Sequence, residues 1–179
     1  MEMIHSDRYQ YCQAIGQDSH RFASQAEQKK QPERKLVLGG VVIPDTCPLA
    51  GNSDADVLLH ALTNAVSGLT GVNILGKKAD DMCLEQGITD SACYLAEAVK
   101  YLDQWELLHL SFAVEAKKPR LSPWIDVIRE NIARLTGLTS DQVGLTATSG
   151  EELTAFGKGK GIMAFCVVSA RKPEISSKR

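Results

Sequence analysis

The chain has 179 residues, 44% of them hydrophobic and 23% charged, with a formal net charge of −2 at pH 7. These values fit one globular domain and argue against a disordered chain, a nucleic-acid-binding protein and a membrane-surface protein. The five cysteines are scattered and include no CxxC pair, which argues against a disulfide scaffold and a cysteine-based zinc finger. The chain starts with polar residues and has no apolar run near ~20 residues, which argues against a secretory signal and a membrane helix. We therefore expect a reduced, cytoplasmic protein.

Two strands and two helices are predicted in the first half of the chain. Residues 11–16 form a short candidate strand, and residues 35–43, rich in Val, Leu and Ile, form a second. Residues 24–35 lack apolar anchors and indicate an exposed loop. Residues 53–71 and 90–102 are predicted helices because apolar side chains recur on one face. In the first helix these are Leu58, Leu62, Ala65 and Leu69.

The second half is predicted to add three strands and one helix. Strands are expected at 109–116, 143–148 and 162–170, and a helix is expected to begin at Ser122-Pro123 and end at Gly137. The order β-β-α-α-β-α-β-β predicts an α/β (α+β) fold. In it, a small mixed sheet carries helices on one face, as a two-layer sandwich.

The last predicted strand is apolar on both faces between Ile162 and Val168. One layer of helices covers only one face of a sheet, so we expect the other face to pack against another subunit. We expect a single domain over residues 11–171, with flexible ends at 1–10 and 172–179.

Asp18-Ser19-His20 and His60 form a candidate metal site. On an extended backbone, Asp18 and His20 point to the same side, and His60 lies on the first predicted helix. One carboxylate and two imidazoles are typical of a zinc site that keeps a position open for substrate. The alternative is a loop aspartate near a surface histidine.

The start of the first helix offers further polar groups. Ser53 or Asp54 can cap it. Asp56 precedes His60 by four residues, so both lie on one helix face and Asp56 can hold the imidazole as a hydrogen-bond acceptor. The alternative is an ordinary solvated helix face.

Three later segments can contact phosphate. Residues 148–151 combine hydroxyls, a glycine and a carboxylate, which suit phosphate and a divalent cation; a capping box between Ser149 and Glu152 is the alternative. Residues 157–161 alternate glycine with lysine and can hold a diphosphate, or form a plain hairpin turn. Residues 116–121 form a basic loop, or a solvated connection.

Together these pieces resemble, in order and spacing, the 2-C-methyl-D-erythritol 2,4-cyclodiphosphate synthase family, from about residue 15 to residue 170. The family motifs are G-x-D-x-H, S-D-x-D-x-x-x-H-A, D-S, A-x-x-P-[KR]-[LM], and A-T-[TS]-x-E followed by G-x-G-x-G. They match residues 16–20, 53–61, 90–91, 116–121, 147–151 and 157–161. Each motif alone is weakly specific, but five in register indicate kinship.

The resemblance implies a metal-dependent phosphorus–oxygen lyase. Asp18, His20 and His60 are then the ligands of a divalent ion, usually Zn²⁺, although such a donor set also accepts Mn²⁺ or Co²⁺. Glu151 helps to bind Mg²⁺ on the substrate phosphates. Thr148 and Ser149 contact the diphosphate, with Ser149 in place of a threonine that stabilises the transition state. The cytidine pocket, largely backbone, comprises Ala116, Lys117, Lys118, Pro119, Arg120 and Leu121.

The resemblance also implies a reaction and an assembly. The reaction cyclises 4-CDP-2-C-methyl-D-erythritol 2-phosphate to 2-C-methyl-D-erythritol 2,4-cyclodiphosphate with release of CMP, in non-mevalonate isoprenoid biosynthesis. The substrate 2-phosphate attacks the β-phosphorus, so no enzyme nucleophile is needed. Homotrimers with active sites between subunits are expected, consistent with the doubly apolar last strand.

Several positions depart from the family pattern. Asn52 replaces a histidine that helps to stabilise the transition state, and Ile74 replaces a carboxylate that contacts the erythritol. In the loop that follows, Asp81 remains in register. Lys158 replaces an arginine. We therefore expect Asn52 and Ser149 as catalytic residues, and Ser53, Asp81 and Lys158 as additional substrate contacts.

These departures leave two alternatives open. One is a divergent cyclase that acts on another nucleotide-linked diphosphate. The other is a non-catalytic, metal-containing trimer that binds a nucleotide or an isoprenoid phosphate.

Overall fold

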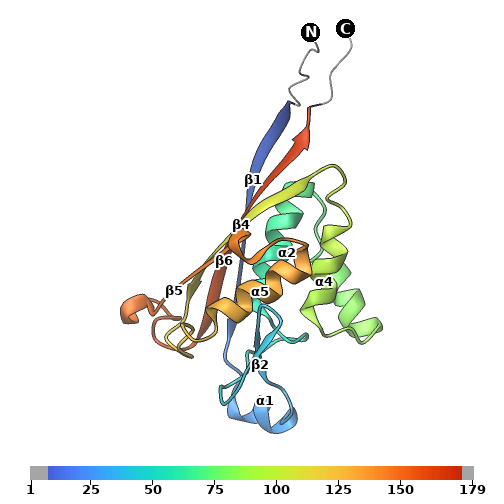
Figure 1. Cartoon of the computed structure of the whole chain (residues 1–179). Helices are drawn as coiled ribbons and strands as arrows, with labels where there is room; N and C mark the ends of the chain where they lie inside the picture. The colour runs from blue at the N-terminus through green and yellow to red at the C-terminus, as the bar shows by residue number, and fades with distance from the viewer. Residues whose placement is uncertain (1–7, 175–179) are drawn as a thin grey trace, which may run out of the picture.

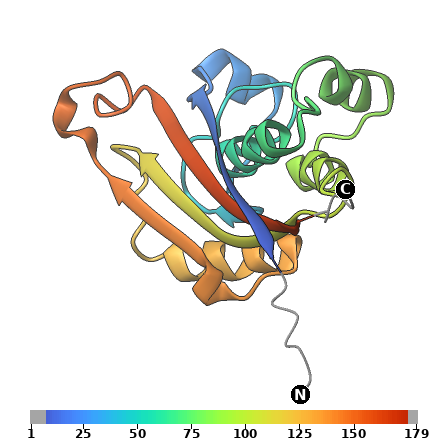
Figure 2. The same cartoon turned by 90° about the horizontal axis from the view of Figure 1, so that it is seen from above.

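The computed structural model describes residues 8–174, and one of its two layers is a four-stranded sheet. Strands β1 (Tyr9–Arg21), β6 (Gly161–Pro173), β4 (Glu106–Glu115) and β5 (Val143–Thr148) lie side by side in that order (Figure 2). β4 and β5 run parallel, and the other neighbouring strands run antiparallel. The predicted mixed sheet is therefore confirmed.

Helices α2 (Val57–Thr70), α4 (Ser91–Val99) and α5 (Ile125–Thr136) form the second layer (Figure 1). Alternate residues of β4 and β6 are buried beneath them, as the period of two along a strand requires. The core between the two layers includes Phe112, Leu110, Leu62, Ile128 and Cys166, all nearly or fully buried. The α/β sandwich predicted from the apolar periodicity is therefore confirmed.

β1 and α2 approach each other so closely at Gly16 that no side chain fits between them. A Cβ atom on Gly16 would lie 2.1 Å from the Ala61 oxygen and 2.2 Å from the Ala65 nitrogen. Because these are backbone atoms in the middle of a helix, they cannot move aside as a flexible side chain can. This contact fixes α2, and with it His60, against β1.

Gly16→Ala is expected to lower the free energy of unfolding by about 1–3 kcal/mol or more, the usual cost of overpacking. Urea denaturation measures the change. Gly68→Ala is the matched control, because its Cβ would meet its nearest neighbours at an ordinary 3.7 Å, and alanine favours a helix over glycine by about 1 kcal/mol. Equal stability of the two variants would contradict the close packing.

The segment before α2 is more structured than its composition predicts. Residues 24–35 contain helix α1 (Gln25–Lys30), which begins at a capping box between Ser24 and Glu27. The strand expected over 35–43 is a hairpin of β2 (Leu36–Leu38) and β3 (Val41–Ile43). Its turn glycines both have positive φ angles, which glycine adopts readily. Among residues 8–174 the hairpin strands pair only with each other, so the predicted second strand does not join the main sheet.

Helix starts also differ from those predicted. α2 begins at Val57 with Asp56 as its N-cap, because Ser53 and Asp54 bind other groups: Ser53 accepts from the Ala55 amide and Asp54 from the Ser91 amide. α5 begins at Ile125 rather than at Ser122. The shorter elements are α3 (Lys77–Asp80), a π-helical turn (Asp81–Glu85) and 3₁₀ turns at Ser140–Gln142 and Gly150–Glu152.

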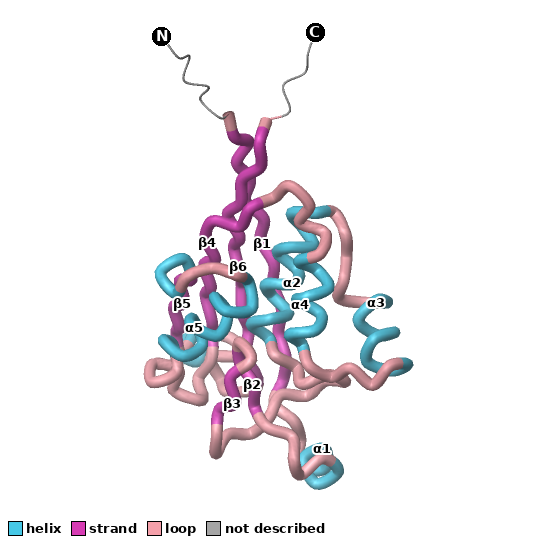
Figure 3. Tube along the Cα trace, turned by 45° about the vertical axis from the view of Figure 1, so that its right-hand side comes forward, coloured by secondary structure: helices cyan, strands magenta, loops and turns pink. Residues whose placement is uncertain are grey.

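β1 and β6 form a ribbon that carries both ends of the described chain, with α1 at the opposite end of the molecule (Figure 3). The strands begin at Tyr9 and end at Pro173, so they extend slightly beyond the predicted domain limits of 11 and 171. The outer parts of the predicted flexible ends lie outside the described residues. No helix within residues 8–174 is long and apolar enough to cross a membrane.

The sheet face opposite the helices carries apolar side chains. Ile15 on β1 is 64% exposed and Tyr11 is 62% exposed. Ile15 pairs with Val167, and the partly exposed Met163 and Phe165 continue the same face of β6. The predicted second apolar face of the last strand therefore exists within one chain.

Candidate active site

Asp18, His20 and His60 converge on the helix side of the sheet. Asp18 and His20 lie two residues apart on β1, and His60 projects from the first turn of α2. The Asp18 Oδ2 atom lies 2.9 Å from His20 Nε2 and 3.0 Å from His60 Nδ1, and these two ring nitrogens are 3.2 Å apart. The structure thus brings the predicted ligands together, with all three donor atoms within 4.8 Å of one another.

The second nitrogen of each imidazole is held by a protein oxygen. His20 Nδ1 lies 2.9 Å from the Ala50 carbonyl oxygen, and His60 Nε2 lies 2.9 Å from the Ser91 hydroxyl. Ser91 also donates a hydrogen bond to the carboxylate of Asp54. Such partners orient a ligating histidine and fix which nitrogen faces the metal.

This arrangement fits a divalent metal ion. Each ring has one nitrogen bound by an oxygen outside the cluster. The other ring nitrogens, His20 Nε2 and His60 Nδ1, are the two that face Asp18. Burial would raise the pKa of Asp18, but hydrogen bonds and charge from both histidines outweigh it and hold that pKa well below its usual range. An ionised carboxylate with two imidazoles is a donor set for Zn²⁺ and similar ions.

Asp56 does not hold His60, so that prediction is wrong. The Asp56 side chain caps α2 and also accepts from the amides of Gly39 and Gly40, at 2.9 Å and 2.6 Å. It is fully buried, so the alternative of a solvated helix face is also wrong. The acceptor beside His60 is instead the Ser91 hydroxyl, which the sequence marks only through the D-S motif.

An open cleft of about 220 Å³ adjoins the metal cluster. Asn52 and Ser53 line it from the loop before α2, as do Leu75, Asp80 and Cys83 from the segment after it. Asp81, the expected substrate contact, is the next residue after Asp80 and is not among those lining the cleft. Sequence reasoning did not single out Asp80.

The other predicted site residues form a second cluster. A pocket of about 340 Å³ is lined by Thr148 at the end of β5, by Ser149 just after it, and by the basic loop residues Ala116, Lys117, Pro119, Arg120 and Leu121. Lys118 of that loop is not among the lining residues. The Ser149 hydroxyl donates to Glu151 at 2.5 Å. The glycine-rich segment that contains Lys158 packs on the basic loop, because the Lys117 amide donates to the Phe156 oxygen at 3.3 Å.

Within one chain, these two clusters lie at opposite edges of the sheet. Ser19, Met163, Glu115 and Thr148 form one row of paired residues across β1, β6, β4 and β5. Three strand spacings separate the ends of such a row, or about 14 Å. Both clusters thus lie at one end of the sheet, but on its two outer strands.

Ser91→Ala is expected to weaken metal binding by about 10- to 100-fold, the usual loss when a partner of a ligating histidine is removed. Without this hydroxyl, the partner of His60 Nε2 at 2.9 Å is lost, and the Ser53 hydroxyl at 3.5 Å remains. Competition with a chromophoric chelator measures the affinity. Ser140→Ala, at an exposed serine before β5, is the control. Unchanged affinity in Ser91→Ala would show that other contacts orient His60.

Comparison with known proteins identifies a protein family that matches most of the chain. Residues 12–171 match the YgbB family. The chain is 43% identical over 160 residues to the 2-C-methyl-D-erythritol 2,4-cyclodiphosphate synthase of Chlamydia muridarum, a match that covers 89% of this chain and 87% of that protein.

Solved structures give the same result. The bifunctional IspDF from Campylobacter jejuni has a TM-score of 0.81 at 27% identity, over 92% of this chain and 43% of that longer one. A 2C-methyl-D-erythritol-2,4-cyclodiphosphate synthase in a CDP-bound form has a TM-score of 0.70 at 28% identity, over 89% of this chain and 99% of that one.

Proposed function

The chain belongs to the YgbB family, whose matched members are 2-C-methyl-D-erythritol 2,4-cyclodiphosphate synthases, and we propose how its two clusters share that reaction. The enzyme is a lyase of isoprenoid biosynthesis that cyclises 4-CDP-2-C-methyl-D-erythritol 2-phosphate and releases CMP. An oxygen of the 2-phosphate forms a bond to the β-phosphorus, and the bond from that phosphorus to CMP breaks. The convergence of Asp18, His20 and His60 beside an open cleft carries the proposal.

The proposed metal half of the site is the cleft beside α2. Asp18, His20 and His60 would hold a divalent ion, Zn²⁺ or alternatively Mn²⁺ or Co²⁺, which supplies positive charge to the reacting diphosphate. Asn52 lines this cleft and can donate a hydrogen bond from its amide to a phosphate oxygen. Ser53, in the same lining, offers a hydroxyl and an amide.

The proposed nucleotide half is the pocket at the end of β5. The loop 116–121 would bind cytidine through its backbone groups, and the Thr148 and Ser149 hydroxyls would donate to the diphosphate. Glu151 would help to hold Mg²⁺ on the phosphates, and Lys158 would add positive charge. The CDP-bound form of a related synthase supports a nucleotide site in this family.

We propose that the active protein is a homotrimer with sites between subunits. Two observations support this assembly. The metal half and the nucleotide half lie on opposite outer strands of one sheet, and the sheet face without helices is apolar around Ile15 and Phe165. Packing these faces around a threefold axis would bury them and bring the β1 edge of one subunit to the β5 edge of the next.

The proposed location is the cytoplasm. All five cysteines, which lie within the described residues, are unpaired. Unpaired thiols are the normal state in a reducing compartment.

Direct turnover tests the function. Purified protein is incubated with 4-CDP-2-C-methyl-D-erythritol 2-phosphate, Zn²⁺ and Mg²⁺. Chromatography should detect CMP, and ³¹P NMR should detect the cyclic diphosphate in equal amount. Tight CMP binding without product would contradict the proposed reaction and favour a non-catalytic nucleotide-binding protein.

A further inference from the structure

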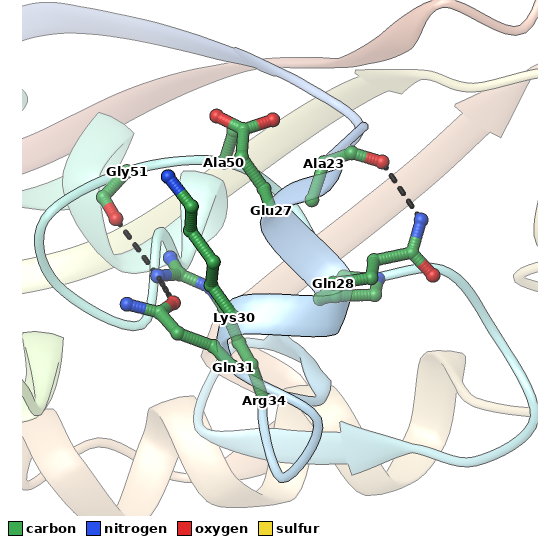
Figure 4. A pocket seen from close by; sticks show the side chains of 9 residues that line it. Ala23, Glu27, Gln28, Lys30, Gln31, Arg34, Ala50 and Gly51 are labelled. Atoms are coloured by element: carbon green, nitrogen blue, oxygen red, sulfur yellow. Dashed lines mark hydrogen bonds between the residues drawn. The ribbon is translucent and has the colours of Figure 1, made fainter. Parts of the chain in front are cut away.

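Arg34 binds the loop before α2 through two backbone carbonyl groups. Its Nη1 donates to the Gly51 oxygen at 2.8 Å, and its Nη2 donates to the Ser53 oxygen at 2.5 Å. Nη1 also donates to Gln31 Oε1 at 3.1 Å. Figure 4 shows the Arg34 side chain between Gln31 and Gly51, at the wall of a cavity of about 120 Å³. All three acceptors are neutral, so these contacts are hydrogen bonds and not salt bridges. The two bonds to Gly51 and Ser53 hold the loop before α2.

The loop that Arg34 holds contacts both histidines of the metal cluster. The Ala50 oxygen is the partner of His20 Nδ1 at 2.9 Å, and the Ser53 hydroxyl lies 3.5 Å from His60 Nε2. A shift of this loop would therefore change the partners of both imidazole rings.

The same loop also places Asn52. This residue lies between the two carbonyl groups that Arg34 binds, and it is one of the residues that line the metal cleft. Gly51 packs against the His20 ring, where an added Cβ would lie 3.4 Å from Cε1. The loop is thus fixed by His20 on one side and by Arg34 on the other.

Arg34 is itself held by the segment around α1. Its backbone N–H donates to the Gln31 oxygen at 3.1 Å. The capping box of Ser24 and Glu27 closes the helix, and Arg21 at the end of β1 pairs with Glu27 at 2.6 Å. Residues 24–35, whose composition predicts only an exposed loop, therefore position the Arg34 side chain.

We propose that Arg34 is a positioning residue for the metal half of the active site. This proposal rests on the proposed function of that half. Arg34 is neither a ligand of the metal cluster nor one of the residues lining the cleft, but it binds the backbone of Ser53, which does line the cleft. It acts by keeping the Ala50 carbonyl on His20 and by keeping Asn52 at the cleft. The planar fork of a guanidinium holds two carbonyl oxygens at once, whereas a lysine ammonium on a flexible stem does not fix both in one geometry.

Two variants, Arg34→Met and Arg34→Lys, test the proposal, with Arg134→Met as control because Arg134 bonds only to Asn131 in the described structure. Zn²⁺ affinity, kcat, KM and the dissociation constant of CMP are measured for each. Hydrogen exchange of the 50–54 peptide is followed in metal-free protein. CMP binding reports whether the variants are folded.

Arg34→Met should lower Zn²⁺ affinity and kcat by about 10- to 100-fold, the usual range when a partner of a ligating histidine is lost, because the Ala50 carbonyl would no longer be held on His20. Its CMP affinity should stay within about twofold, because neither Arg34 nor the loop that it holds is among the residues lining the nucleotide pocket. Exchange of the 50–54 peptide should speed up, and Arg34→Lys should recover part of each loss. If Arg34→Met does not fold, Arg34→Lys alone decides, with smaller losses of the same kind.

Two results would overturn the proposal. One is unchanged Zn²⁺ affinity and kcat in the folded variant. The other is an equal loss of CMP binding, which would indicate a general structural role. Failure of the proposed function has a different signature, because the wild-type protein would then form no product while the Zn²⁺ and exchange measurements still report on Arg34.

Discussion

His60→Ala is expected to abolish stoichiometric binding of the divalent ion and to reduce turnover by about 10²- to 10³-fold or more, the range seen when charge stabilisation at a reacting centre is lost. His60 supplies one of three donors, and its ring also links Asp18 on β1 to Ser91 on α4. Two remaining donors bind a divalent ion much more weakly than three. Metal analysis of the purified variant and a CMP-release assay measure the two effects.

The control for this prediction is His109→Ala, because His109 lies on an exposed part of β4 outside the cluster. It should keep full metal content. CMP affinity should be unchanged in His60→Ala if the fold is intact. Full stoichiometric metal in His60→Ala would show that the ion is bound elsewhere, and the assignment of Asp18 and His20 as ligands would fall with it.

The parts of the fold that could be predicted are those that depend on local pattern. The strand 143–148 matches β5 residue for residue, and the helical stripes of 53–71 and 90–102 mark α2 and α4. Apolar periodicity records which face of an element is buried, so it survives in the sequence. The Asp18 and His20 pair could be predicted for the same reason, since a period of two places both on one face.

The parts that could not be predicted depend on partners far away in sequence. Asp56 has the spacing to face His60, but amides 16 and 17 residues earlier bind its carboxylate instead. The Ser91 hydroxyl reaches His60 from another helix, 31 residues later. A pattern within one helix carries no signal of either contact, because packing between elements decides them.

The start of α2 shows the same limit. Any of Ser53, Asp54 and Asp56 has a suitable side chain for the N-cap. The tertiary structure decides among them, because it uses Asp54 to bind Ser91 and leaves Asp56 next to the first free amides of the helix. Of two aspartates only two residues apart, Asp56 is therefore the helix cap, whereas Asp54 binds the serine that contacts His60.

Mixing two inactive variants is expected to restore activity if the active site forms between subunits. His60→Ala disables the metal half, and Glu151→Ala disables the nucleotide half. In a mixed trimer, one interface joins the intact metal half of one subunit to the intact nucleotide half of its neighbour. Random reassortment of equal amounts should therefore recover about a quarter of wild-type turnover, since most trimers are mixed and each holds one intact site of three.

The matched control mixes His60→Ala with Asp18→Ala, which both damage the metal half. No interface in such a trimer joins two intact halves, so this mixture should stay inactive. Light scattering before and after mixing reports the assembly, and a tag on one variant shows that subunits exchange. Within one chain, the two halves lie on strands β1 and β5, at opposite edges of the sheet. Proven exchange without recovered turnover, or a fully active monomer, would therefore mean that a single chain brings both halves together by a movement of its loops.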